Sequence, residues 1–153
     1  SMRTTFFKLW VHVILRTPNE YCIIDPSVRH LLIENIERQF IEIGSPITAL
    51  GGADDHLHIL FEQNPLLSLH ETLEYIKKTS AYIYHKQLKQ SPSNPLWAEG
   101  FVAFSVSTSQ IAKVVDFIEN QADIHQKMAL EAEIKLLNNL HQVDEADNIA
   151  NVA

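Results

Sequence analysis

The stretch PITALGGADDHLHILF, residues 46–61, contains two short apolar runs separated by a segment rich in glycine and aspartate. Such a segment is typical of a turn, so the sequence predicts a β-hairpin that pairs residues 46–50 with residues 56–61. His56 and His58 begin the second strand, and side chains two residues apart on a strand face the same side of a sheet. The hairpin therefore predicts two imidazoles that project together and could chelate a divalent metal, although a His-x-His pair alone is weak evidence.

Upstream of the hairpin the sequence predicts a strand and a helix. Residues 5–17 alternate between two sets of side chains and are rich in aromatic and β-branched types, which indicates a strand. Asp25 followed by Pro26 predicts a helix N-terminus, and apolar residues then recur at helical spacing until Gly44.

Downstream of the hairpin the sequence predicts three helices and one strand. A capping box, Ser68-x-x-Glu71, opens a second helix that ends before the breaker-rich residues 91–95. Residues 101–106 indicate a strand, Ser107-x-x-Gln110 opens a third helix, and a further helix is expected at about 130–140. The whole order is that of an α+β, ferredoxin-like split β-α-β fold with an antiparallel sheet and extra C-terminal helices.

The size and charge of the chain limit the range of functions that it could have. Its 153 residues suit one domain, with a core at about residues 5–128 and an irregular acidic tail at the end. The net charge of −7 argues against generic nucleic-acid binding, although five of the 19 acids lie after residue 128. With no secretory signal pattern after Ser1-Met2, no long apolar run and a single cysteine, Cys22, we expect a cytoplasmic protein that does not enter the membrane.

The motif at residues 55–60, Asp-His-hydrophobic-His-hydrophobic-Leu, resembles the His-hydrophobic-His (HUH) endonuclease motif of single-tyrosine transposases. These enzymes are carried by small bacterial insertion sequences, and the REP-associated tyrosine transposases are similar. The resemblance continues through Trp97-x-x-Gly100-Phe101 and through Phe117-Ile118-Glu119-Asn120-Gln121, and covers roughly residues 5–128.

The resemblance implies a site and a reaction. The family's helix motif is Tyr-Ile-x-x-Gln, in which the tyrosine attacks DNA and the glutamine joins the two histidines as a metal ligand. His56, His58 and Gln121 are then the expected ligands of a divalent metal, Mg²⁺ or Mn²⁺, with Phe117 at the nucleophile position. The metal polarises the scissile phosphate while a phenolate attacks phosphorus.

Phenylalanine at position 117 keeps the volume of tyrosine but has no oxygen, so the resemblance predicts a protein that is inactive in strand cleavage. The phenylalanine could be an engineered change or a natural divergence, and the sequence does not separate the two. The remaining tyrosines, Tyr21, Tyr75, Tyr82 and Tyr84, lie away from the expected position. His125 could be an additional ligand, although a solvated histidine at the end of the helix explains it better.

Lysines on the second helix and the last helix of the core are candidate phosphate contacts, and Trp97 or another exposed aromatic side chain is a candidate for base stacking. Ordinary solvated helix faces explain the same lysines equally well. The candidates are Lys77, Lys78, Lys86, Lys89 and Lys113, with Lys127.

Three functions remain open at this point. The first is a transposase-like protein that binds single-stranded or hairpin DNA, either as a monomer or as a homodimer. The second is a domesticated, non-catalytic DNA-binding module, and the third is a metal-dependent hydrolase or ligand-binding domain unrelated to DNA.

Overall fold

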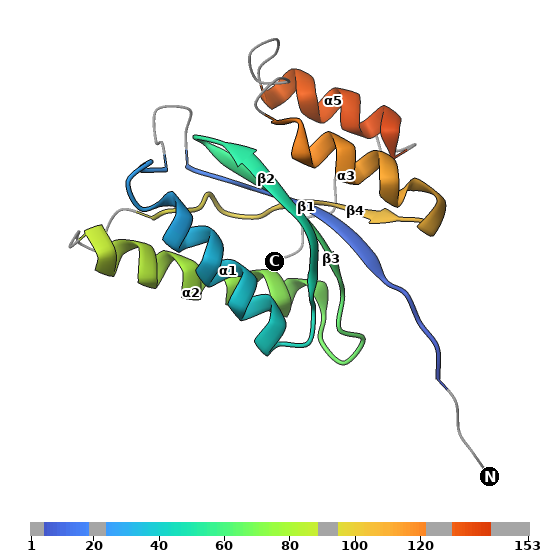
Figure 1. The fold of residues 1–153 in the computed structure, drawn as a ribbon, viewed down its shortest axis with the longest axis horizontal. Coiled ribbons are helices and arrows are strands. Elements are labelled where there is room, and N and C mark those ends of the chain that lie inside the picture. The colour runs from blue at the N-terminus through green and yellow to red at the C-terminus, as the bar shows by residue number, and fades with distance from the viewer. Residues whose placement is uncertain (1–4, 19–23, 89–94, 122–129, 142–153) are drawn as a thin grey trace.

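A computed structural model describes residues 5–18, 24–88, 95–121 and 130–141 of the chain. Along the chain (Figure 1) the elements are β1 (Trp10–Arg16), α1 (Arg29–Glu42), β2 (Ile47–Ala53), β3 (His56–Glu62), α2 (Leu69–Leu88), β4 (Val102–Val106), a 3-10 turn (Thr108–Gln110), α3 (Ile111–Glu119) and α5 (Leu130–Leu140). No helix in these ranges is both long and apolar enough to cross a membrane.

The four strands form one antiparallel sheet in the order β2-β3-β1-β4. This order and the alternation of strands and helices confirm the predicted α+β, ferredoxin-like arrangement. β3 is an inner strand, and all but the last of its seven residues are buried. Ile14 of β1 and Gly51 of β2 flank His58 from the two sides.

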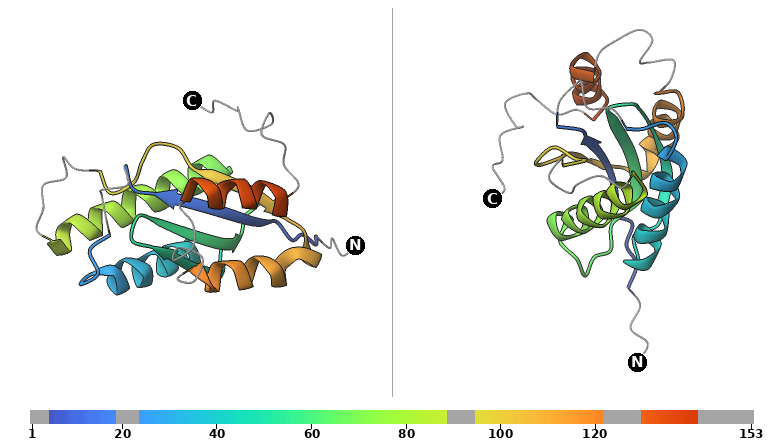
Figure 2. Two further views of the ribbon diagram at one scale, coloured as in Figure 1. Left: turned by 90° about the horizontal axis from the view of Figure 1, so that it is seen from above. Right: turned by 90° about the vertical axis from the view of Figure 1, so that its left-hand side faces the viewer.

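The two faces of the sheet are covered by different helices (Figures 1 and 2). On one face Val13, Ile59 and Phe61 pack with residues of α1 and α2 in the largest apolar cluster. On the other face Leu60 packs with Val114 and Ile118 of α3, while Ile14 packs with Leu137 of α5. Because side chains alternate along a strand, His56 and His58 share the face of Leu60 and lie under α3 and α5.

Several predicted element ends differ from the structure. β1 begins at Trp10 rather than at residue 5. α1 begins at Arg29, because the Asp25 carboxylate accepts hydrogen bonds from the backbone and hydroxyl of Ser27 and closes a turn instead of capping the helix. The Ser107 hydroxyl contacts that of Ser109 and does not cap α3.

Two of the predicted helix signals are confirmed. The backbone N–H of Ser68 donates to the Glu71 carboxylate and the backbone N–H of Glu71 donates to the Ser68 hydroxyl, both at 3.0 Å, which is the reciprocal pattern of a capping box. At the end of α1, Gly44 has a φ of 71°, the left-handed conformation that favours glycine after a helix.

Gly51 and Gly52 lie inside β2 and not in the predicted turn, which consists of Asp54 and Asp55. A Cβ atom at Gly51 would come within 2.3 Å of the carbonyl oxygen of Ile118 in α3, and one at Gly52 within 2.2 Å of the carbonyl oxygen of His56. Glycine is therefore needed for close backbone contact, and Gly51 sets how near α3 lies to the sheet.

We expect Gly51→Ala to lower the free energy of unfolding by about 1–3 kcal/mol, because the added methyl group must push α3 away from β2. The matched control is Thr48→Ala, which removes atoms from an exposed side chain on the same strand. Urea unfolding followed by circular dichroism measures both. Equal midpoints for the two variants would show that the close approach of Ile118 does not constrain the fold.

Candidate metal centre

His56 and His58 lie side by side on β3, and both side chains are completely buried. Their ring centroids are 5.1 Å apart and the rings are nearly perpendicular. The structure thus brings the two predicted histidines together on the face of the sheet that α3 and α5 cover.

Two side chains from outside the sheet reach the Nε2 atoms of these histidines. The Glu133 carboxylate of α5 lies 2.9 Å from Nε2 of His58 and 3.5 Å from Nε2 of His56. The Gln121 amide oxygen lies 3.2 Å from Nε2 of His56, while its NH₂ group donates to the carbonyl of Phe117 at 3.2 Å. Glu133 is fully buried and Gln121 is 2% exposed, so the four side chains form a closed polar cluster.

Each histidine is also held at its other ring nitrogen. Nδ1 of His56 donates to the Asp55 carboxylate at 2.7 Å, and Nδ1 of His58 shares a hydrogen bond of 2.8 Å with Nε2 of His12. His12 in turn lies 3.0 Å from His141, whose ring stacks on Phe104. These contacts turn both Nε2 atoms toward Glu133, as the outer hydrogen bonds of metal-binding histidines do.

The electrostatics of the cluster follow from burial and pairing. Burial would by itself lower the pKa of His56, but hydrogen bonds and charge from Glu133 and Asp55 outweigh burial and raise this pKa. Burial would raise the pKa of Glu133, but hydrogen bonds from His56 and His58 outweigh it and hold this pKa well below its ordinary value. Burial next to other histidines lowers the pKa of His12 to about 2, so that imidazole is neutral.

The donor set fits a divalent metal ion. One donor atom from each of His56, His58 and Glu133 can be chosen so that all three lie within 4.8 Å of one another, and Gln121 adds an amide oxygen on the same side. Two imidazole nitrogens with a carboxylate are donors that divalent transition metals accept.

Phe117 borders the cluster. Its half-buried ring stands edge-on to His58 with centroids 5.6 Å apart, and 6.5 Å from the ring of His12. α3 ends at Glu119, so Gln121 lies just past the helix, yet its hydrogen bond to Phe117 keeps the two residues one turn apart. The relative placing of Phe117, Gln121 and the histidines is the one that the i, i+4 spacing predicts.

The other predicted site residues lie elsewhere. Tyr75, Tyr82 and Tyr84 belong to α2, on the opposite face of the sheet, so the tyrosines of this helix do not replace the missing hydroxyl. The expectation that Trp97 is exposed was wrong, since the side chain is 6% exposed and its indole N–H donates to the hydroxyl of Ser80. Tyr21, Lys89, His125 and Lys127 fall outside the described residues.

Four of the predicted DNA contacts are within the described residues. Lys78 and Lys86 are exposed on α2 and Lys113 is exposed on α3. Lys77 is partly buried, donates to the carbonyl of Gly100 at 3.1 Å and lies 3.7 Å from the Glu74 carboxylate. Three of the four therefore gather on one helix.

Sequence reasoning missed Glu133, His12 and His141. Composition alone groups Glu133 with the acids of the tail, although it lies three residues after Leu130 and four before Leu137, on the apolar side of α5. An acidic residue on the apolar side of a helix indicates that its carboxylate has a buried polar or charged partner, because acids are rarely buried unpaired. His12 has the same strand parity as Ile14, so it belongs to the buried face that carries His58.

Asp55→Ala is expected to weaken divalent-metal binding about 10- to 100-fold, because the carboxylate that orients His56 is removed while every donor atom remains. Asp54→Ala is the matched control, since Asp54 occupies the same turn and pairs with Arg29. Titration calorimetry with Mn²⁺ measures both variants. Equal weakening by both would mean that the turn, and not the hydrogen bond to His56, supports the site.

The chain resembles known proteins in its sequence and in its fold. The sequence profile of the family described as "Transposase IS200 like" matches residues 5–121. Among solved structures, a candidate transposase from Deinococcus radiodurans R1 is 24% identical, with a TM-score of 0.61 over 79% of this chain and 96% of that one. A REP-associated tyrosine transposase bound to a REP hairpin is 15% identical, with a TM-score of 0.61 over 82% of this chain and 73% of that one.

At these identities the two solved structures support the fold alone, while the profile covers most of the chain. No curated protein sequence matches the chain. With the profile matched from residue 5 to Gln121, across both histidines, the chain belongs to the IS200-like transposase family.

Proposed function

We propose that this chain binds single-stranded or hairpin DNA and holds a divalent metal beside it, but does not form the covalent link to DNA that its relatives form through tyrosine. The observation that carries the proposal is the ring of Phe117, which stands against His58 and has no oxygen to attack phosphorus. Among the described residues of the α3 and α5 face, no tyrosine stands in for it.

The proposed metal ligands are His56, His58 and Gln121, with Glu133 added to the set expected from the family. Two imidazole nitrogens favour Mn²⁺ over Mg²⁺, because Mg²⁺ prefers oxygen donors in a regular octahedron and keeps several waters. When bound, such an ion would polarise a phosphate group next to position 117. Asp55 and His12 serve to orient the two imidazoles.

DNA is the proposed partner because of the family and the distribution of charge. A solved structure with this fold contains a REP-associated tyrosine transposase bound to a REP hairpin. Although the whole chain is acidic, Lys78, Lys86 and Lys113 are exposed on α2 and α3, where they can meet phosphates. Pairing of two copies stays a prediction.

Two gels run on one sample test the proposal. The unmodified protein is mixed with labelled hairpin and single-stranded oligonucleotides from the sequences flanking its gene, with Mn²⁺ present and at low salt. We expect a retarded band on a native gel and only free DNA after denaturation. Absence of retardation at low salt would refute DNA binding, and a protease-sensitive band after denaturation would refute the lack of covalent chemistry.

A further inference from the structure

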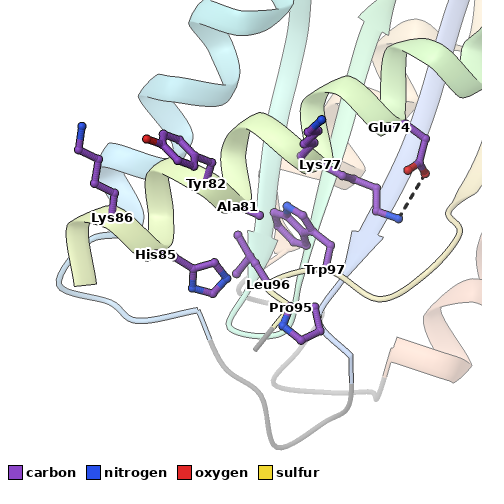
Figure 3. Close-up of a pocket in the computed structure, with 10 residues that line it drawn as sticks. Glu74, Lys77, Ala81, Tyr82, His85, Lys86, Pro95, Leu96 and Trp97 are labelled. Carbon is purple, nitrogen blue, oxygen red and sulfur yellow. Dashed lines mark ion pairs between the residues drawn. The ribbon is translucent and has the colours of Figure 1, made fainter. Parts of the chain in front are cut away.

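A groove of about 700 Å³ runs along α2, on the face of the sheet opposite to His56 and His58. One wall is a face of α2 from Glu74 to Lys86, and the other is the segment Pro95, Leu96 and Trp97 (Figure 3). Glu74 and Lys86 are twelve residues apart on the helix, a rise of about 18 Å, which is the length of several stacked bases at ~3.4 Å each.

The second wall is fixed in place by hydrogen bonds. The indole N–H of Trp97 donates to the Ser80 hydroxyl at 2.9 Å, and the backbone N–H of Ala98 donates to the carbonyl of Arg16 in β1 at 2.8 Å. Lys77 joins α2 to the carbonyl of Gly100. The groove therefore has a fixed shape. It is lined by the exposed ring of Tyr82 and by small exposed parts of Leu96 and Trp97, which together offer bases an aromatic and apolar surface.

His85 gives the groove a polar group that the fold does not use. The side chain is 8% exposed, and within the described part of the chain neither ring nitrogen has a hydrogen-bond partner. Figure 3 shows the ring turned toward Leu96 and Pro95. A buried polar group without a partner is costly, so its presence in a groove points to a ligand that supplies the missing bonds.

The rim of the groove carries positive charge. Lys77, Lys78 and Lys86 line it, and α2 contains no acid from Tyr75 to its end. Among the described residues that line the groove, Glu74 is the only acid, and it pairs with Lys77. In a chain of net charge −7, this local excess of lysine fits a polyanion.

We propose that this groove binds a stretch of single-stranded DNA, with bases against the exposed ring of Tyr82 and the small exposed parts of Trp97 and Leu96, a base edge hydrogen-bonded to His85, and phosphates at Lys78 and Lys86. The imidazole ring presents two nitrogens for hydrogen bonds, and the edge of a base offers both donors and acceptors. The proposal rests on the proposed function and names where the strand is held. The groove lies on the face of the sheet opposite to the candidate metal centre. DNA held in the groove is therefore anchored away from the phosphate that would lie beside Phe117.

The decisive variant is His85→Phe, which keeps a flat ring but removes both nitrogens. We expect about tenfold weaker binding of labelled oligothymidylate, measured by fluorescence anisotropy, because the hydrogen bonds to the base can no longer form. The same change removes buried polar groups without partners, so the melting temperature should stay level or rise. Unchanged affinity, or weaker binding that only accompanies a fall in melting temperature, would overturn the role of His85.

The lysines are tested by the salt dependence of binding. Lys78→Ala combined with Lys86→Ala should lower the slope of log affinity against log salt by about 0.7 for each phosphate that is no longer neutralised. Lys135→Ala, an exposed lysine of α5 on the other face, is the matched control and should leave the slope unchanged. Equal slopes for the unmodified protein and the double variant would place the phosphates elsewhere.

Tryptophan fluorescence reports on the groove itself. The chain has two tryptophans, so Trp10→Phe leaves Trp97 as the single reporter. Oligothymidylate should quench this signal at the concentrations that saturate the anisotropy. If DNA binds but Trp97 is not quenched, or if an acidic peptide alone quenches it, the groove proposal fails and the proposed function stands. If the unmodified protein binds no DNA, both fail.

Discussion

Replacing Glu133 by alanine is expected to lower the free energy of unfolding by about 3–5 kcal/mol. The Glu133 carboxylate is fully buried between His56 and His58, and it is a main reason that the pKa of His56 is raised. Without it, Nε2 of His58 loses the carboxylate that lies 2.9 Å away, and His56 loses one of the two carboxylates that raise its pKa. Urea unfolding followed by circular dichroism measures the decrease.

Two further variants distinguish the effect of the Glu133 carboxylate from the effect of changing any residue of α5. Asn139→Ala changes an exposed residue of α5 and should shift stability by no more than about 0.5 kcal/mol. Glu133→Gln keeps the side-chain volume but removes the charge, so it should bind Mn²⁺ more weakly while losing less stability than the alanine variant. If Glu133→Ala unfolds at the same urea concentration as Asn139→Ala, the contact between α5 and the histidines does not exist in solution.

Much of the fold could be predicted because the signals are local. The order of strands and helices follows from alternating or helical spacing of apolar residues, and the common face of His56 and His58 follows from strand parity alone. The capping box at Ser68 and the stop at Gly44 are equally local, and the structure confirms both. The bounds of α5 also agree with the prediction.

The wrong predictions concern contacts between distant segments. The glycine-rich composition suggests that Gly51 and Gly52 are in a turn, but they lie in β2. Glycine is needed there because the backbones of α3 and β3 come too close for a side chain. Trp97 is buried and donates a hydrogen bond to Ser80 of α2. The residues next to Trp97 in the sequence do not indicate this partner, which lies 17 positions away. Local patterns do not encode which helix lies over which strand.

The same limit explains why sequence reasoning missed some residues of the candidate metal centre. The family's motifs supply His56, His58 and Gln121, but Glu133 enters only because α5 packs Leu137 against Ile14 and Phe104. The role of His12 can be inferred only when the pairing of β1 with β3 is known, because that pairing places His12 diagonally opposite His58. The cluster around His56 and His58 therefore consists partly of residues from the sequence motif and partly of residues that the packing of α5 and β1 brings to them.

The second large effect is expected at position 117. Phe117→Tyr should turn a protein that gives no covalent DNA adduct into one that does. The tyrosine oxygen would form a bond to phosphorus while the bond from phosphorus to the 3′ oxygen breaks, which leaves a phosphotyrosine and a free 3′-hydroxyl.

The most direct measurement is a denaturing gel of Phe117→Tyr with labelled single-stranded oligonucleotides from the flanks of the gene, in the presence of Mn²⁺. The account predicts a slower, protease-sensitive band with Phe117→Tyr, none with the unmodified protein, and none when His56→Ala is combined with Phe117→Tyr. If Phe117→Tyr retards the DNA on a native gel yet gives no covalent band, a single missing oxygen is not what separates this protein from an active transposase.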